Sequence, residues 1–295
     1  MWRRSVNKAL ARVTGYQLQH VENGSDTRQR RNDAEQQLAR ARLRRANART
    51  ERMRRRLQEA EDAPGRKRTR TMPAHYDQGA VDILRRVESR TMTDYPKLFG
   101  LVEATRYVVR NDIPGDVVEC GVWRGGSMQA VALALQEQGR TDRALHLFDT
   151  FDGMPLPTEK DRRGDTTAAE LLATHDRDHR VWAIAGLDDV RQAMREVGYP
   201  EERVHFHRGL VEDTVPALAP ERIALLRLDT DWYESTRHEL EHFYHRLSPG
   251  GVLIIDDYGD WEGARQATDE FLASVGEPLL LVPLSSGRLA VKPLR

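Results

Sequence analysis

P-E-R-I-A-L-L-R-L-D-T-D-W-Y (residues 220–233) and S-P-G-G-V-L-I-I-D-D-Y-G-D (residues 248–260) are the stretches that decide the fold. Each contains a short run of Ile, Leu and Val, Ile223–Leu228 and Val252–Ile255, that ends in carboxylates. Such runs are typical of buried parallel strands. The segment Tyr233–Leu247 between them has apolar residues at a helical period, and Ser-Pro-Gly-Gly follows as a stop. The pattern predicts strand, helix, strand.

Four aspartates follow these two runs. If the strands lie side by side, Asp229, Asp256 and Asp257 meet at the carboxyl edge, where open α/β sheets bind ligands. Asp231 comes two residues after Asp229, so an extended backbone would point both side chains to the same side. Four acids without compensating charge would repel one another, and a hard divalent cation would relieve the repulsion. A turn or helix-cap role explains one such Asp, but explains two pairs less readily.

Composition limits the class of protein. The chain has 295 residues and a single cysteine, Cys120, which excludes a disulfide framework and suggests a reducing compartment. No apolar run approaches the roughly 20 residues that span a bilayer. The basic N-terminus lacks the apolar region of a signal peptide. We therefore expect a cytoplasmic protein that does not associate with membranes.

The net charge of zero hides two oppositely charged parts. Residues 1–72 contain 20 Lys and Arg against 8 Asp and Glu, while the rest contains 26 against 38. The boundary falls near Ala63-Pro64-Gly65. We expect residues 1–70 to form a basic helical extension and residues 71–295 to form the main domain.

The extension favours a helix from about Ser25 or Asp26 to Glu61. A solvated helix, a weakly self-associating helix and a surface for nucleic acid or another acidic partner all remain open. No aromatic residue interrupts its arginine run, so nucleic acid has no stacking platform and is not the partner we expect. We expect a homo-oligomer instead, because one stripe follows a heptad spacing over about three heptads. The stripe consists of Ala39, Leu43, Ala46, Thr50, Met53, Leu57 and Ala60.

A second motif, G-D-V-V-E-C-G-V-W-R-G-G-S, covers residues 115–127. It predicts a strand over Asp116–Cys120, a glycine loop, and a helix over Met128–Gln138, an arrangement that cradles nucleotide-like ligands. A dinucleotide fingerprint needs glycine where this chain has Trp123, whose indole would crowd a pyrophosphate. Glu119 would also repel pyrophosphate but suits an ammonium group. S-adenosylmethionine carries an α-amino group and a sulfonium, so the motif favours it over NAD.

Strands and helices continue to alternate along the chain. Asp149 ends the strand Ala144–Phe148, and an acid there accepts hydrogen bonds from ribose hydroxyls. The charged segment 160–165 is expected to be mobile and would suit a lid. We predict an α/β fold with a Rossmann-like class I methyltransferase sheet of about seven strands, preceded by the helical extension. Further strands are expected at 204–207, 278–283 and 288–292, and helices at 96–110, 187–197 and 264–274.

The motifs V-V-E-C-G-V-W-R-G-G-S, L-F-D-T-F-D-G-M-P, L-D-T-D-W-Y-E-S-T and S-P-G-G-V-L-I-I-D-D-Y-G occur in this order. They resemble the macrocin O-methyltransferase family, over about residues 91–283 and not over residues 1–70. The resemblance implies magnesium-dependent methyl transfer from S-adenosylmethionine to a sugar hydroxyl of a glycosylated antibiotic. It implies Asp229, Asp256 and Asp257 as metal ligands and Asp231 as general base. The cofactor contacts that it implies are Met92, Thr93, Glu119, Gly121, Ser127, Asp149, Val211, Glu212 and Asp213.

Two other functions are kept as alternatives. A catechol-type O-methyltransferase uses the same kind of metal site, but usually has Lys near the base position and Asp-Asn as its second acidic pair. This chain has Asp231 and Asp257 there. A non-catalytic protein that acts through the basic helix would need a degraded site, and every site position is filled. The absence of His and Cys among the three ligands favours magnesium over zinc.

Overall fold

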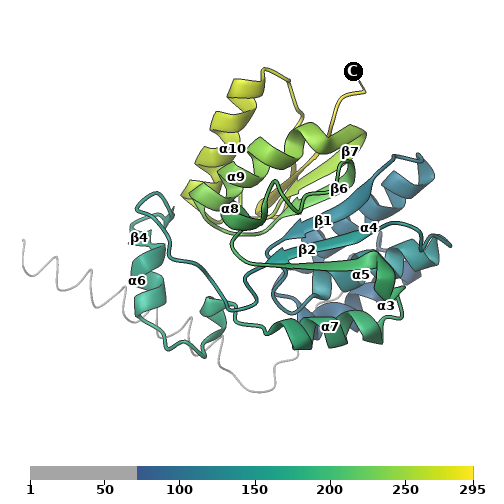
Figure 1. Ribbon diagram of the computed structural model, residues 1–295, viewed down its shortest axis with the longest axis horizontal. Helices are drawn as coiled ribbons and strands as arrows, with labels where there is room; N and C mark the ends of the chain where they lie inside the picture. The colour runs from purple at the N-terminus through teal and green to yellow at the C-terminus, as the bar shows by residue number, and fades with distance from the viewer. Residues whose placement is uncertain (1–71, 295) are drawn as a thin grey trace, which may run out of the picture. The chain divides into compact units, whose positions relative to one another are not determined.

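The computed structural model describes residues 72–294. The predicted basic helix and its heptad stripe lie outside the described residues. Within them, seven strands form one sheet in the order β5-β2-β1-β6-β7-β9-β8, with helices on both of its faces (Figure 1). The predicted α/β fold with about seven strands is confirmed.

Five strands run parallel, and the last two form an antiparallel hairpin, as predicted. Strands β2 and β5 extend from one side of β1, whereas β6 and β7 extend from the other, so the strand order reverses between β1 and β6. The bounds are β1 Asp116–Cys120, β2 Leu145–Asp149, β5 Val204–Arg208, β6 Ile223–Leu228, β7 Leu247–Ile255, β8 Val282–Leu284 and β9 Gly287–Val291.

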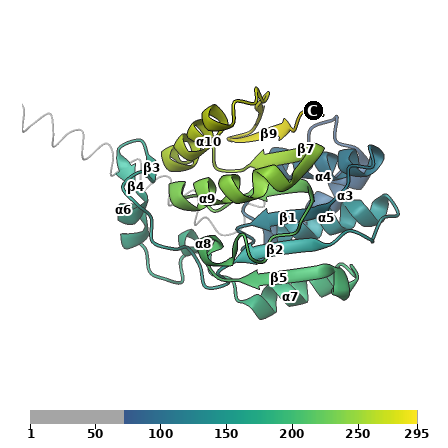
Figure 2. The same cartoon turned by 45° about the horizontal axis from the view of Figure 1, so that its top comes forward.

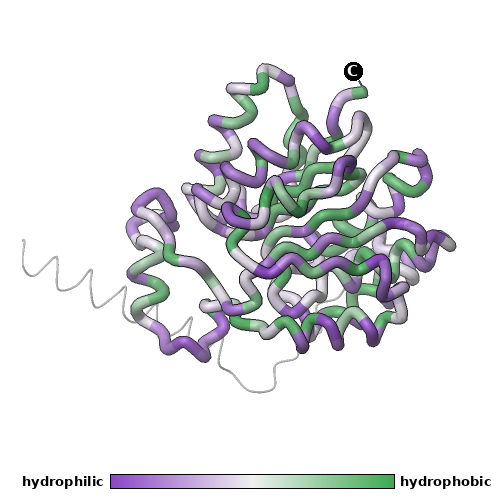
Figure 3. Tube along the Cα trace, viewed as in Figure 1, coloured by the Kyte–Doolittle hydropathy of each residue, from purple (hydrophilic) through white to green (hydrophobic). Residues whose placement is uncertain are grey.

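The central strands are apolar because both of their faces are covered. Every residue of β6 is buried, and hydrophobic residues follow the central strands, with hydrophilic stretches on the outer helices and loops (Figure 3). Strand β7 begins earlier than predicted and includes the Ser-Pro-Gly-Gly segment. The Gly250 N–H donates to the Lys292 carbonyl (2.9 Å) and the Ser248 hydroxyl to the Pro114 carbonyl (2.6 Å), so neighbouring segments hold it in the sheet.

Two sets of helices cover the two faces of the sheet (Figure 2). One set comprises α3 (Gln78–Val87), α4 (Tyr95–Arg110), α5 (Gly126–Glu137) and α7 (Leu187–Glu196), and the other α8 (Val211–Thr214), α9 (Tyr233–Phe243) and α10 (Glu262–Val275). Helix α3 was not predicted, although Asp77 caps it by accepting from the Ala80 N–H (3.0 Å). Single-turn 3-10 helices lie at Glu88–Arg90, Arg180–Trp182, Glu201–Arg203 and Tyr244–Arg246. No helix within residues 72–294 is both long and apolar enough to cross a membrane.

An insertion of residues 150–186 lies between β2 and α7. It contains a small hairpin, β3 (Arg162–Arg163) and β4 (Thr166–Thr167), and helix α6 (Ala168–Ala173), which lie beside the main sheet (Figure 1). Neither the hairpin nor α6 was predicted. The segment expected to be a charged mobile loop therefore includes β3, and its Asp161 is fully buried. Its role as a lid stays a prediction.

Candidate active site

A cavity of about 470 Å³ opens at the carboxyl ends of the parallel strands. Residues that follow β1, β2, β5, β6 and β7 line it, at the point where the strand order reverses. Ligands of open α/β sheets bind at this point. The loops after β1 and β6 touch there: Gly121 has a φ of 80°, and a Cβ at this position would collide with the carbonyl of Asp229. Only glycine combines this backbone with so close an approach.

Most of the predicted cofactor residues lie on the cavity wall. Glu119 and Asp213 do not: Glu119 is buried in β1, and Asp213 is exposed in α8. Whether any of these residues contacts a cofactor stays a prediction. The residues on the wall are Met92, Thr93, Gly121, Ser127, Asp149, Val211 and Glu212.

Glu119 carries an unsatisfied buried oxygen. Its Oε1 accepts a hydrogen bond from Arg227 (2.6 Å), whereas its Oε2 is buried without a hydrogen-bond partner among residues 72–294. Burial raises the pKa of Glu119 to about 7, against the opposing effect of Arg227. Buried polar atoms are nearly always paired, so Oε2 fits a donor that arrives with a ligand. An α-ammonium group such as that of S-adenosylmethionine would be such a donor.

Asp149 holds the glycine loop in shape. Its Oδ2 accepts from the N–H groups of Val122 (2.6 Å) and Trp123 (3.0 Å), and its Oδ1 from that of Phe151 (2.7 Å). Trp123 has a φ of 46° and lines the cavity. A carboxylate has about four acceptor positions, and the Thr150 hydroxyl also donates to Oδ1, at 3.4 Å. A contact between Asp149 and ribose hydroxyls would therefore have to share or replace one of these bonds.

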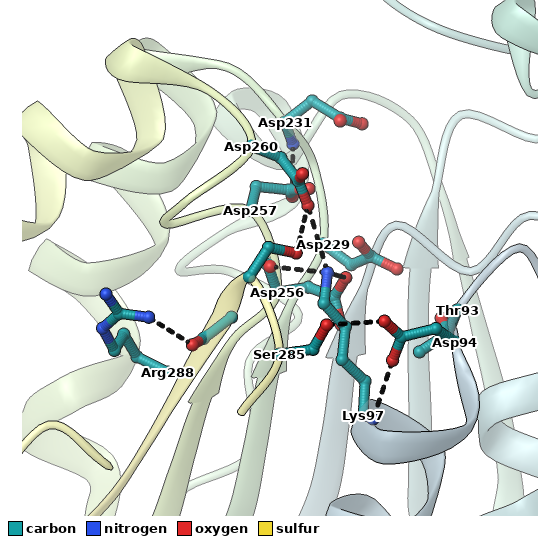
Figure 4. A network of polar contacts seen from close by, with 12 residues as sticks. Thr93, Asp94, Lys97, Asp229, Asp231, Asp256, Asp257, Asp260, Ser285 and Arg288 are labelled. Atoms are coloured by element: carbon teal, nitrogen blue, oxygen red, sulfur yellow. Dashed lines mark hydrogen bonds and ion pairs between the residues drawn. The ribbon is translucent and has the colours of Figure 1, made fainter. Parts of the chain in front are cut away.

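Asp229, Asp256 and Asp257 come together at the ends of β6 and β7 (Figure 4). One oxygen atom from each lies within 4.8 Å of the others, which confirms the prediction that they meet at one sheet edge. All three offer oxygen donors, which suit magnesium or calcium, whereas zinc sites usually include His or Cys. These three residues would hold the metal.

The prediction that these acids lack compensating charge is wrong. Arg227 in β6 makes ion pairs with Asp229 and Asp256, both at 2.7 Å. Lys97 in α4 reaches Asp256 at 2.7 Å, and Figure 4 shows its ammonium group pointing into the group of acids. The sequence held one signal for this arrangement. Arg227 interrupts an apolar strand, and arginine is almost never fully buried unless it is paired.

The two cations do not balance all of the buried acids. Burial and the neighbouring acids raise the pKa values of Asp229 and Asp257 well above their usual range. Asp256 is different: burial opposes its ionisation, but Arg227 and Lys97 hold its pKa low. Asp229 and Asp257 therefore resist ionisation at this site, and a divalent cation bound there would stabilise their charged forms.

Asp231 lies beside this group but is not one of its three members. The prediction that an extended backbone aligns it with Asp229 is wrong, because Asp231 has a φ of 67°. Its N–H donates to Asp257 (3.0 Å), and its Oδ1 accepts from the Trp261 indole (2.6 Å). Figure 4 shows its carboxylate turned away from the other three. Burial raises the pKa of Asp231 to about 6, so the side chain combines proton affinity with a place on the cavity wall.

The insertion supplies another part of the cavity wall, through residues that the sequence reasoning missed. It is fixed to the turn after β6 by two hydrogen bonds: the Tyr233 N–H donates to Asp161 (2.7 Å), and the Trp232 indole donates to the Pro155 carbonyl (3.1 Å). Its residues on the wall are Thr150, Gly153, Met154, Pro155, Arg163, Arg180 and Ala183.

Comparison with known protein families matches residues 17–282 to Macrocin-O-methyltransferase (TylF). The chain belongs to this family. It is an S-adenosylmethionine-dependent O-methyltransferase. The resemblance inferred from the motifs is confirmed. The family match begins at residue 17, however, so the expectation that the resemblance does not cover residues 1–70 is only partly met.

Two characterised relatives and one solved structure illustrate the family. A "8-demethyl-8-(2,3-dimethoxy-alpha-L-rhamnosyl)-tetracenomycin-C 4'-O-methyltransferase" from Streptomyces olivaceus is 35% identical over 188 residues, which cover 64% of this chain and 69% of that protein. A demethyldecarbamoylnovobiocin O-methyltransferase from Streptomyces niveus is 34% identical, covering 63% of this chain and 68% of that protein. The structure of the O-methyltransferase NovP aligns with a TM-score of 0.61 and 31% identity, covering 69% of this chain and 82% of that one.

Proposed function

We propose that this enzyme transfers a methyl group from S-adenosylmethionine to a sugar hydroxyl of a glycosylated small molecule in antibiotic biosynthesis, and that the reaction depends on magnesium. One observation carries the proposal: Asp229, Asp256 and Asp257 converge beside Asp231 on the wall of a cavity at the strand-order switch. The name of the tetracenomycin relative, which specifies a 4'-O-methyltransferase of a rhamnosyl compound, supports the sugar as acceptor.

The chain's residues would act on the acceptor hydroxyl by orienting it and removing its proton. Asp231 is the proton acceptor, since its pKa of about 6 leaves it ionised near neutral pH while it still has affinity for a proton. The Trp261 indole and the Asp257 carboxylate fix Asp231 from two sides. The order imposed on the reacting groups converts a bimolecular encounter into a step between fixed partners. When bound, a divalent cation lowers the pKa of a hydroxyl that it contacts and fixes the hydroxyl oxygen.

The acceptor would enter beside the insertion. Arg163 and Arg180 line this part of the wall, so the surroundings of the sugar differ in charge from the acidic side of the cavity.

Three further expectations belong to this proposal. We also propose that the enzyme is cytoplasmic, that it is a homo-oligomer, and that residues 1–70 form a basic helical extension to the methyltransferase domain.

A methyl-transfer assay on the purified full-length protein tests the proposed function. A rhamnosylated acceptor and a catechol are each incubated with labelled S-adenosylmethionine, with magnesium or with excess EDTA. We expect transfer to the glycoside with magnesium, and its loss in EDTA and in Asp229→Ala and Asp257→Ala. Glu221→Ala is the matched control, because Glu221 lies exposed just before the other end of β6.

Full activity in EDTA would contradict the metal dependence. Preference for the catechol would favour the catechol-type alternative, in which Asp229, Asp256 and Asp257 would hold the metal in the same way. If S-adenosylmethionine bound but no acceptor were methylated, and calorimetry detected no magnesium, the non-catalytic alternative would gain support.

A further inference from the structure

Arg227 joins two groups of residues that have separate predicted roles. The residue is 2% exposed and lies in β6, the central strand beside the strand-order switch. Its Nη1 is 2.6 Å from Glu119 Oε1 and 2.7 Å from Asp229 Oδ2. Its Nη2 is 2.9 Å from Thr93 Oγ1 and 2.7 Å from Asp256 Oδ1. Each terminal nitrogen therefore bridges one predicted cofactor residue and one predicted metal ligand.

Both terminal nitrogens of the guanidinium are engaged. Three of the four contacts are hydrogen bonds, to Glu119, Thr93 and Asp256, and the fourth, to Asp229, is an ion pair. The guanidinium is planar and rigid, which means that its two ends cannot adjust independently. A shift of Glu119 or Thr93 must therefore change how the guanidinium faces Asp229 and the direction in which it donates to Asp256.

We propose that Arg227 is a positioning residue that couples the two halves of the site, so that S-adenosylmethionine and magnesium each tighten the binding of the other. The inference rests on the proposed function, which supplies these two ligands. An ammonium group at the unpaired Oε2 of Glu119 would order that carboxylate and, through it, the guanidinium. The oriented guanidinium then holds Asp229 and Asp256 in the arrangement that a metal needs. Coupling of binding free energies is reciprocal, so the metal has the same effect on the cofactor.

Lys97 provides a matched control within the same site. It is also buried and cationic, and it contacts Asp256 Oδ2 at 2.7 Å and Asp260 Oδ2 at 3.2 Å. No hydrogen bond joins it to Glu119 or Thr93 in the part of the chain that the structure describes. Of the two predicted groups, Lys97 therefore contacts the metal ligands alone, whereas Arg227 contacts both the metal ligands and the cofactor residues.

The experiment measures binding without turnover. S-adenosylhomocysteine, which has the ammonium group but no methyl to transfer, is titrated by calorimetry into full-length protein with and without saturating magnesium. We expect magnesium to tighten binding to the wild type by about 5-fold or more, the lower end of typical coupling. We call the ratio of the two affinities, with and without magnesium, the coupling factor. Arg227→Lys keeps the charge, but one ammonium cannot span both ends of the site, so its coupling factor should be close to one. Lys97→Met should keep the wild-type coupling factor.

Thr93→Val guards against a variant that fails to fold. Thr93 is only partly buried, and the change removes one of the four contacts without altering any charge, so its coupling factor should fall part of the way. A wild-type factor near one, or an Arg227→Lys variant that binds both ligands more weakly with an unchanged factor, would overturn the inference. A wild type that binds no magnesium at all would overturn the proposed function as well, so the two failures are distinguishable.

Discussion

Asp231 is held by two neighbours, one a hydrogen-bond donor and the other a hydrogen-bond acceptor. Trp261 donates to its carboxylate, and Asp257 accepts from its backbone N–H. The non-glycine φ of 67° places it in a conformation that costs about 1–3 kcal/mol and persists only where the surroundings enforce it. Such positions cluster at functional sites, which agrees with the role as base that we propose for Asp231.

The change Asp231→Asn separates a base from a metal ligand. Asparagine keeps the side-chain shape and can still accept the hydrogen bond from Trp261, but it cannot take up the proton. We expect turnover to fall by about 10²–10⁴, the usual contribution of a positioned base, with near-normal affinity for magnesium and S-adenosylmethionine. Initial rates and metal titration on one preparation measure both. Loss of metal affinity would make Asp231 a ligand, and almost full turnover would leave deprotonation to other groups.

The places of individual residues in the site could be predicted well from the sequence where they depend only on position along a strand. Asp229, Asp256 and Asp257 could be grouped because carboxyl ends of neighbouring parallel strands share an edge. Lys97 could not be assigned in the same way, since it lies on a helix and reaches Asp256 only through the packing of α4 against the sheet. Asp231 depended on a φ angle that local sequence does not determine.

Elements were predicted best where both faces are buried. Strands β1 and β6 have the predicted bounds, because their apolar runs are short and end abruptly. Strand β7 extends through Ser-Pro-Gly-Gly because β6 and the segment near Lys292 pair with it, which are contacts from elsewhere in the chain. The capping box of Thr167 and Glu170 marked the start of α6, but the short helix after it has little periodicity.

Helix α9 receives its cap from the insertion. Its own N-cap residue, Trp232, makes no side-chain cap bond, and Asp161 accepts from the Tyr233 N–H instead. Asp161→Ala should therefore destabilise the domain by about 1–2 kcal/mol, the upper part of the range for a lost cap, measured by urea unfolding. It should also weaken acceptor binding, since Asp161 holds the insertion to this turn. Thr167→Ala, which removes the partly buried side-chain cap of α6, is the control that should leave acceptor binding unchanged.

Equal acceptor binding in Asp161→Ala and Thr167→Ala would contradict the link between this cap and the acceptor. A loss of stability in Asp161→Ala without any change in acceptor binding would restrict Asp161 to a structural role.

Strands β2 and β5 carry a cluster of histidines whose charge opposes folding. Burial, followed by repulsion from His146 and His205, lowers the pKa of His207 to about 4, against about 6.5 in an unfolded chain. The unfolded state therefore binds more protons, and stability should fall as the pH decreases from about 6.5 to about 4. His207→Gln should make the free energy of unfolding less dependent on pH over this range. His245→Gln, at an exposed position, should keep the wild-type dependence, and an unchanged profile in His207→Gln would contradict the assignment.

The two parts of the whole chain, residues 1–72 and residues 73–295, differ in charge. Residues 1–72 are strongly basic, and the remainder is acidic. The residues that the structure describes contain the complete sheet, the cavity and every acid of the proposed metal site. The family match, however, begins at residue 17. The match therefore includes part of residues 1–70, whereas every group of the proposed chemistry lies among the residues that the structure describes.

Deletion of residues 1–62 tests this division. We expect the shortened enzyme to methylate a small glycoside at a rate close to that of the full chain, because no group required by the proposed mechanism lies before Met92. We expect its oligomeric state to fall, since the heptad stripe ends at Ala60 and is the feature that favours self-association. Light scattering and turnover measure the two effects on the same preparation. A folded, monodisperse truncation without any activity would show that the extension contributes to the site, and an unchanged oligomeric state would assign self-association to the methyltransferase domain.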